Sequence, residues 1–145
     1  MMKLNKQEVI ELLPQKDPFR FVTEITELIP GEMAKGYLTI DDNISALKGH
    51  FPGMPILPGV LILEAMAQVG TCAILKMDNL AGKIPIFTGL NDVKFRHQVK
   101  IGDKLEIDVS LNKWRFPLGS GSAIATVNGE LACKANLSFF LVDYK

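Results

Sequence analysis

The alternation of apolar and polar residues predicts a chain built mostly of β-strands. Runs rich in β-branched and aromatic residues, bounded by Gly, Pro, Asn and Asp, recur along its length. The expected strands cover residues 19–29, 33–40, 84–88, 93–99, 104–114, 120–127 and 130–142. Asn128 and Gly129 join the last two as a hairpin, because this dipeptide readily adopts the backbone angles of a tight turn. We therefore expect a mostly antiparallel sheet of about seven strands.

One segment departs from the strand pattern. Residues 59–77 contain no proline and no strong helix breaker apart from Gly70, and they are apolar around one acid and one amide, Glu64 and Gln68. A helix that is apolar on all sides is buried on most faces in a soluble protein. The two polar residues near its centre argue against a membrane span. The sequence thus predicts an α+β fold in which one curved antiparallel sheet wraps one long central hydrophobic helix.

The rest of the chain adds little to this architecture. Asn5, with Glu8 as its capping partner, predicts a short helix that Pro14 ends. Residues 41–53 are rich in Asp, Asn and Gly and are expected to form a loop. No repeat, low-complexity segment or linker interrupts the sequence, so we expect a single domain over residues 1–145.

Charge and composition exclude several classes of function. Lys and Arg together number 16, as do Asp and Glu, so there is no basic excess of the kind that binds nucleic acid. A net charge near zero favours self-association. Cys72 and Cys133 lack metal-ligand spacing and are expected to be buried thiols. The N-terminal sequence does not resemble a signal peptide, so the expected location is the cytoplasm.

Residues 50–68 bring together groups suited to acid–base chemistry. His50 stands in a loop of prolines and glycines, which costs little entropy to order, and imidazole exchanges protons near neutral pH. If the helix is buried, desolvation raises the pKa of Glu64 and lets its carboxyl donate a proton. Gln68, one turn further on, is placed to hydrogen-bond Glu64 and set its orientation.

Other interpretations of these residues remain open on pattern alone. His50 can be an ordinary loop residue. Val60, Glu64, Gln68 and Thr71 also form a helical stripe that would suit solvent. The stripe and the buried acid are equally compatible with the sequence.

The start of the long helix supplies a third chemical group. The backbone N–H groups of Gly59 and Val60 belong to the first turn, where amides lack partners within the helix. They are suited to bind a carbonyl oxygen that becomes an enolate-like anion, although a plain Pro-Gly helix start explains the same residues. Base, amides and acid together suit the removal of water from a 3-hydroxyacyl thioester. His50 would take the proton beside the carbonyl and Glu64 would protonate the departing hydroxyl, with no metal or redox cofactor.

The same segment carries a family resemblance. Its sequence, HFPGMPILPGVLILEAMAQ, matches every specified position of the motif HFPGxPxxPGVLxxEAxAQ. The chain therefore resembles the FabZ-type 3-hydroxyacyl-acyl-carrier-protein dehydratases, which have the hotdog fold. The resemblance implies that His50 and Glu64 are the catalytic pair and that the amide of Gly59 polarises the thioester carbonyl. Val60 and Gln68 join the substrate-binding candidates because of their positions on the helix.

The resemblance also implies an activity and partners. The expected reaction is dehydration of (3R)-3-hydroxyacyl-acyl-carrier-protein to trans-2-enoyl-acyl-carrier-protein in fatty acid or related lipid biosynthesis, without a cofactor. The expected partner is an acyl carrier protein whose phosphopantetheine arm holds the acyl group. The family forms homodimers that often assemble into hexamers, and its site lies between two subunits beside an apolar tunnel.

Two departures from the family pattern bear on the substrate. The family usually begins PHR-x-PFLLVDR, whereas residues 14–24 read PQKDPFRFVTE. Residues 114–117, WRFP, replace an Arg-rich run. These changes favour, as an alternative, a specialised paralogue of a polyketide-like or aryl-polyene pathway. Further alternatives are a non-catalytic acyl-binding hotdog module, a dehydratase that also isomerises the new double bond, and a thioesterase; the isomerising relatives tend to carry Asp at the position of Glu64.

Overall fold

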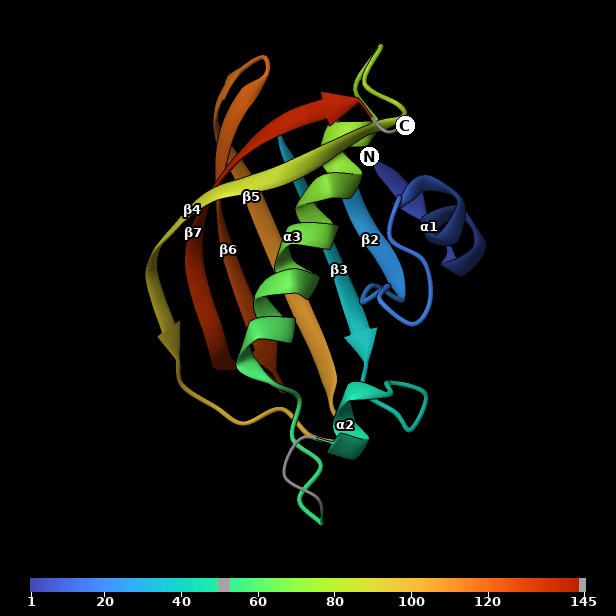
Figure 1. Cartoon of the computed structure of the whole chain (residues 1–145), viewed down its shortest axis with the longest axis vertical. Helices are drawn as coiled ribbons and strands as arrows, with labels where there is room; N and C mark the ends of the chain where they lie inside the picture. Colours follow the sequence, from blue (N-terminus) through green and yellow to red (C-terminus); the bar gives the residue numbers. More distant parts are fainter. Residues whose placement is uncertain (50–52, 144–145) are drawn as a thin grey trace.

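The computed structural model describes residues 1–49 and 53–143. Its strands are β1 (Met2–Leu4), β2 (Glu24–Ile29), β3 (Met33–Thr39), β4 (Lys83–Phe95), β5 (Lys104–Arg115), β6 (Leu118–Val127) and β7 (Glu130–Asp143). The helices are α1 (Lys6–Leu12), α2 (Ala46–Gly49) and α3 (Gly59–Leu75). The described strands form one antiparallel sheet in the order β1-β2-β3-β5-β6-β7-β4, which curves around α3 (Figure 1). This is the α+β arrangement that the sequence predicted.

The helix α3 is buried because the sheet presents an apolar face to it. Met66 and Val69 of α3 have no exposed surface. Along β5, Leu105, Ile107 and Val109 alternate with exposed residues and are at most 2% exposed, as expected for a strand with one covered face. α3 ends at Leu75 rather than at residue 77, where the sequence placed its end.

The strands differ from the predicted ones in four places. β4 ends at Phe95, so residues 96–99, which the sequence placed in a strand, lie outside it. β4 is one strand where two were predicted, because irregularities between Phe87 and Gly89 and between Asn91 and Lys94 shift its register without ending the pairing with β7. Residues 19–23 are not a strand, since this segment turns its backbone toward α3 instead. The turn between β5 and β6 consists of Phe116 and Pro117 alone. β6 therefore begins at Leu118, two residues before the predicted start at residue 120.

Two short elements were not predicted from the sequence. β1 is only three residues long, and α2 is a four-residue helix in the segment expected to be a loop.

The N-terminal helix α1, in contrast, begins as predicted. The Asn5 side chain accepts from the Glu8 N–H, and the Asn5 N–H donates to the Glu8 carboxylate, both at 2.9 Å. The capping box is therefore confirmed.

The two cysteines are free and buried, as the sequence predicted. Burial raises the pKa of the Cys72 thiol to about 12 and that of the Cys133 thiol to about 11. Both therefore stay protonated near neutral pH, which makes them poor nucleophiles. In the described ranges, no helix combines the length and apolar character needed to cross a bilayer.

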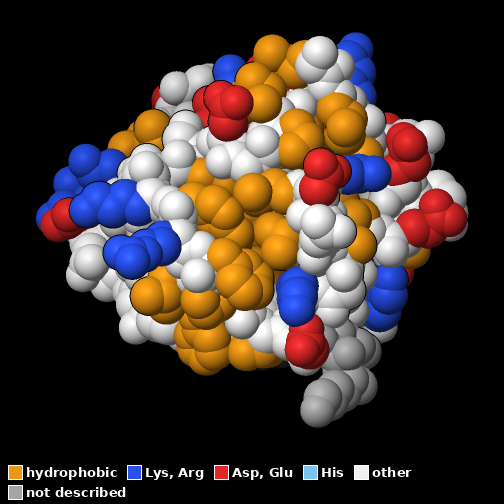
Figure 2. Space-filling model, turned by 90° about the horizontal axis from the view of Figure 1, so that it is seen from above, with side chains coloured by type: hydrophobic (Ala, Val, Ile, Leu, Met, Phe, Trp, Pro, Cys, Tyr) orange, Lys and Arg blue, Asp and Glu red, His pale blue; other side chains and the backbone are white. Residues whose placement is uncertain are grey.

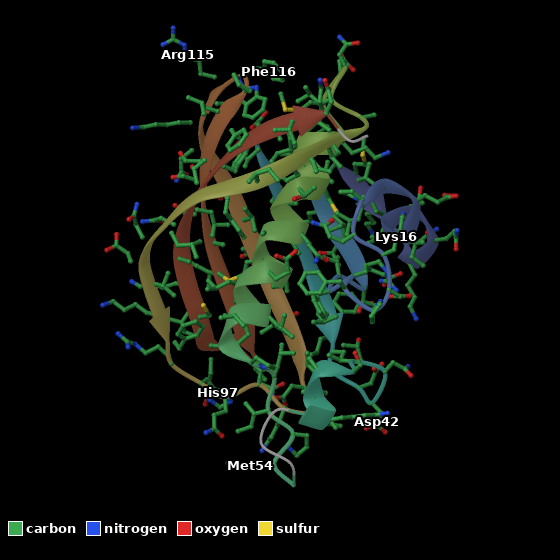
Figure 3. The ribbon with its side chains drawn as sticks, in the orientation of Figure 1. Lys16, Asp42, Met54, His97, Arg115 and Phe116 are labelled. Atoms are coloured by element: carbon green, nitrogen blue, oxygen red, sulfur yellow. The ribbon has the colours of Figure 1, made fainter. Side chains whose placement is uncertain are left out.

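Apolar side chains remain exposed at the outer strand. β4 pairs only with β7, and its Ile86, Phe87 and Leu90 are each 41% exposed. Figure 2 shows apolar side chains gathered in the middle of the face seen from above, with Lys and Arg side chains toward its border. Figure 3 places Arg115 and Phe116 at this upper end of the molecule, and places Met54 and His97 at the opposite end, where α3 begins.

The two faces of the sheet provide a matched test of the fold. Ile107 on β5 is 1% exposed beneath α3, whereas Ile124 on neighbouring β6 is 47% exposed on the opposite face. Ile107→Ala should lower the free energy of unfolding by about 2–5 kcal/mol, because it leaves a cavity in the core. Ile124→Ala should change it by less than about 0.5 kcal/mol. Urea unfolding at fixed protein concentration measures both, and equal losses would contradict the arrangement.

Candidate functional site

Glu64 lies on α3 with its carboxyl mostly removed from water. Burial raises the pKa of this carboxyl above its ordinary value, and a hydrogen bond from Gln68 partly opposes the rise. Desolvation is the larger of the two causes, so the neutral acid is favoured over a wider pH range than for an exposed glutamate. A neutral carboxyl can donate a proton, which is the property the sequence predicted for this residue.

The Gln68 side chain fixes the surroundings of Glu64. It has no exposed surface, and its Nε2 donates to Glu64 Oε2 at 2.8 Å and to the Phe19 carbonyl at 2.9 Å. Its Oε1 accepts from the Phe21 N–H at 2.7 Å. The bond to Glu64 was expected from the helical spacing. The bonds to Phe19 and Phe21 were not, because these partners are nearly fifty residues away in sequence. All these contacts are within the protein, so the substrate-binding role of Gln68 stays a prediction.

The structure excludes the interpretation of the helix stripe as a solvent-facing one. Gln68 and Thr71 are buried, at 0% and 1% exposed, while Val60 at the start of α3 is 70% exposed. The stripe thus passes from solvent at Val60 into the protein interior. Glu64 lies between these two environments. A carboxyl at this position can be desolvated and still be reached by a substrate that enters from the solvent.

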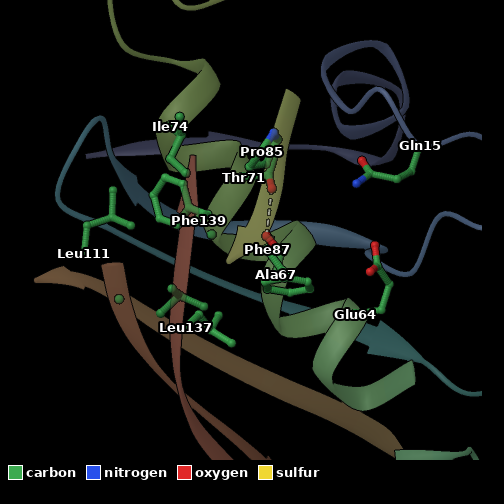
Figure 4. A pocket seen from close by; sticks show the side chains of 13 residues that line it. Gln15, Glu64, Ala67, Thr71, Ile74, Pro85, Phe87, Leu111, Leu137 and Phe139 are labelled. Atoms are coloured by element: carbon green, nitrogen blue, oxygen red, sulfur yellow. Dashed lines mark hydrogen bonds between the residues drawn. The ribbon is translucent and has the colours of Figure 1, made fainter. Parts of the chain in front are cut away.

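An apolar pocket of about 80 Å³ begins at Glu64 and follows α3 (Figure 4). Its α3 wall includes Ala67, Thr71 and Ile74, which lie on one face of the helix. From Glu64 to Ile74 the helix rises by about 15 Å at 1.5 Å per residue. The opposing wall comes from the sheet and the segment after α1, through Gln15, Pro85, Phe87, Val109, Leu111, Gly121, Leu137 and Phe139.

The pocket wall is apolar beyond Glu64 and Gln15. The Thr71 hydroxyl donates to the Ala67 carbonyl at 2.8 Å, so its proton is already used within the helix. The pocket therefore combines one acid with a long apolar surface. That combination suits a substrate with a polar reacting end and a hydrocarbon chain.

The start of α3 has the amides that the sequence predicted. Pro58 caps the helix without a side-chain hydrogen bond, and no acceptor for the N–H of Gly59 or Val60 lies in the part of the chain that the structure describes. Gly59 has a second, structural reason to be glycine. A Cβ there would lie 2.9 Å from the ring of Phe95. The Phe95 ring thus occupies the space beside the Cα of Gly59.

His50 lies outside the described residues. Later in the same motif, within the described residues, the Leu57 N–H donates to the Val99 carbonyl at 2.7 Å. His97, the other histidine of the sequence, is 40% exposed in its side chain and lies 3.4 Å from the Glu130 carboxylate. It is therefore a surface residue. Within residues 1–49 and 53–143, no cluster of three or more His, Cys, Asp or Glu is arranged to hold a metal ion.

The raised pKa of Glu64 predicts a pH-dependent cost to stability. At low pH the carboxyl is neutral in both the folded and the unfolded chain. As pH rises past the ordinary value of 4.5, the unfolded chain ionises first, so the free energy of unfolding falls until pH passes the folded-state pKa. Glu64→Gln removes this dependence and keeps an acceptor for Gln68.

Urea unfolding of both proteins across pH measures the effect. The free energy of unfolding of Glu64→Gln minus that of the wild type should grow as pH rises above 4.5 and then level off. A difference that stays constant, or that shrinks with rising pH, would show that Glu64 is not destabilised as a carboxylate.

Comparison with known proteins places these features in a family. A family model described as a FabA-like domain matches residues 13–136. Two curated proteins named 3-hydroxyacyl-[acyl-carrier-protein] dehydratase FabZ, from Bacillus cereus (strain AH187) and Bacillus thuringiensis (strain Al Hakam), are each 41% identical over 142 residues. In both cases the match covers 98% of this chain and 99% of the relative.

Solved structures show the same fold at lower identity. The dehydratase heterocomplex ApeI:P from Xenorhabdus doucetiae matches with a TM-score of 0.77 and 16% identity, over 93% of this chain and 91% of that one. Cj0977 from Campylobacter jejuni matches with a TM-score of 0.71 and 15% identity, over 95% and 90%. These likenesses confirm the hotdog fold, and the family match and the full-length relatives show that the chain belongs to the FabA-like family.

Proposed function

We propose that this protein dehydrates (3R)-3-hydroxyacyl-acyl-carrier-protein to trans-2-enoyl-acyl-carrier-protein. The observation that carries the proposal is the position of Glu64, a desolvated acid at the polar end of an apolar pocket. The full-length relatives named FabZ support the same reaction. Fatty acid synthesis, or a related lipid pathway, is where such a product is used.

The proposed reaction divides between two side chains. His50 takes the proton from C2, and the electron pair of that C–H bond forms the C2–C3 double bond. Glu64 gives its proton to the hydroxyl on C3, the C3–O bond breaks, and water leaves. The imidazolium and carboxylate that remain return to their starting forms by exchanging protons with solvent. No metal or redox cofactor takes part in these steps.

The substrate would lie along α3. The N–H groups of Gly59 and Val60 are available at the exposed start of the helix, where they would bind the thioester carbonyl and stabilise the charge that develops on its oxygen. The acyl chain would extend past Glu64 toward Ile74, along the apolar wall. The phosphopantetheine arm of the acyl carrier protein would approach from the solvent side of Val60.

A homodimer is the assembly that we propose for the active protein. The edge of β4 that faces away from β7 is unpaired in the described chain, and an exposed apolar edge strand is suited to pair with a second copy. The exposed side chains of Ile86, Phe87 and Leu90 would be covered by such pairing. Hexamers would be a further assembly of these dimers, and His50 of one copy would act with Glu64 of the other.

The aromatic part of the pocket wall favours a second, narrower candidate. Phe139 lines the pocket, and Trp114 packs against it with ring centroids 6.1 Å apart. A Cβ at Gly119 would lie 2.4 Å from the Phe139 ring, so the ring occupies the space that a larger residue would take. Bulky rings at this position would limit the acyl group. A specialised paralogue with its own acyl preference is therefore the alternative within the same reaction.

The activity is tested by hydration of an enoyl thioester, the reverse reaction. Purified protein with crotonyl- or a longer enoyl-acyl carrier protein should cause the ultraviolet absorbance of the conjugated double bond to fall. Glu64→Gln and His50→Ala should each lower turnover by about 10²–10⁴-fold, the range for losing a general acid or base. Both variants should keep the wild-type circular dichroism spectrum.

Glu11→Gln provides the matched control. Glu11 is an exposed residue of α1, so the same change of side chain there should leave turnover unchanged. Wild-type turnover in Glu64→Gln would overturn the assignment of the acid. Absence of any turnover in the unaltered protein, with several acyl lengths, would overturn the proposed function.

A further inference from the structure

Gln15 carries an unused hydrogen-bonding group in the same pocket as Glu64. Its Oε1 is buried and, among the described residues, is the one buried side-chain nitrogen or oxygen without a partner. Gln15 and Glu64 both line the pocket, and Figure 4 shows their polar ends on the same side of it, opposite Leu111. Buried polar atoms without partners are rare and costly, so this one calls for an explanation.

The position of Gln15 is fixed from both sides. Leu13 is 1% exposed, and its N–H donates to the Val9 carbonyl at 3.0 Å, which attaches the chain to α1 just before Gln15. After Gln15, the backbone at Phe19 and Phe21 is held by Gln68. Gln68 also hydrogen-bonds Glu64. The buried amide of Gln68 therefore helps to position both Gln15 and Glu64 at the pocket.

The pocket itself offers almost no donor to Gln15. The Thr71 proton is bonded to the Ala67 carbonyl, and the remaining lining groups are apolar side chains or glycine. When it is protonated, the carboxyl of Glu64 is the lining donor that remains, and in the proposed reaction its proton goes to the substrate. Within one chain, the donor for Gln15 Oε1 is then missing, and the molecule that fills the pocket can supply it.

We propose that Gln15 is a substrate-binding residue whose Oε1 accepts a hydrogen bond from the 3-hydroxyl of the acyl group. This inference rests on the proposed function. The hydroxyl would donate a hydrogen bond to Gln15 Oε1, keep its proton, and turn a lone pair toward the Glu64 O–H. Glu64 then protonates the oxygen, the C3–O bond breaks, and water departs with both of its hydrogens. The enoyl product has no hydroxyl and makes no such bond.

This difference between substrate and product gives the proposal a kinetic signature. Gln15→Met keeps the length of the side chain and removes the acceptor. In dehydration it should raise KM for the 3-hydroxyacyl thioester by about 3- to 10-fold, the value of one neutral hydrogen bond, with kcat nearly unchanged. In hydration it should lower kcat by the same factor with KM for the enoyl thioester unchanged, since the reaction equilibrium is fixed.

Steady-state kinetics in both directions test this, with Gln7→Met as the matched control. Gln7 is an exposed glutamine of α1, and its variant should behave as the wild type in both directions. Circular dichroism checks that Gln15→Met folds, and Gln15→Ala takes its place if it does not. Binding of a saturated acyl thioester, which lacks the hydroxyl, should be equal in the wild type and the Gln15 variant.

The outcomes separate the two claims. If the wild type turns over and the Gln15 variant matches it in both directions, the role of Gln15 fails and the proposed function stands. The role also fails if the variant loses kcat in dehydration without a rise in KM. It fails as well if the variant binds the saturated thioester more weakly by the same factor by which its KM for the 3-hydroxyacyl thioester rises. If the wild type has no turnover in either direction, the proposed function fails and the role of Gln15 fails with it.

Discussion

The candidate site depends on the three hydrogen bonds of the Gln68 side chain. One donor goes to the Glu64 carboxyl and the other to the Phe19 carbonyl, while the oxygen accepts from the Phe21 N–H. Loss of this amide would leave buried backbone groups without partners, at a cost of about 1–3 kcal/mol each. The same amide therefore orients the acid and ties the chain after α1 to the central helix.

Glu64 gains its chemical character from where the sheet covers α3. The sheet makes the far turns of the helix almost solvent-free, whereas the first turn at Val60 stays exposed. One turn into the helix, a carboxyl is desolvated enough to favour its neutral form and still borders the pocket. The hydrogen bond from Gln68 works against full neutrality, so the acid is held in place without losing its ability to ionise. A proton donor that must be used repeatedly needs both properties.

Much of the fold and the principal acid could be predicted from the sequence. The apolar run around Glu64 indicated a buried helix, and the four-residue spacing to Gln68 indicated their hydrogen bond, because both features depend on local periodicity. The assignment of residues 19–23 as a strand was wrong. Their alternation satisfies a strand pattern, yet Phe19 and Phe21 direct backbone groups to Gln68, a contact that no local pattern encodes.

Gln15 illustrates the same limit within the site. The comparison with the family pattern marked residues 14–24 as unusual, and Gln15 stands where that pattern has a histidine, but it did not indicate a role for the side chain. Only the folded chain places Gln15 beside the pocket, away from the exposed glutamine at position 7. The Phe95 ring lies beside Gly59, and this contact too joins residues that are far apart in the sequence. The role of His50 stays a prediction from its motif.

Carbon-13 NMR of the Glu64 carboxyl carbon, followed against pH, tests the central claim most directly. Comparison of the spectra of wild-type protein and Glu64→Gln assigns the signal. A titration midpoint clearly above the ordinary value of 4.5 is the result that a desolvated, proton-donating Glu64 requires. A midpoint at or below that value would mean that the carboxyl is ionised wherever the protein works, and the acid proposed here would have no proton to give.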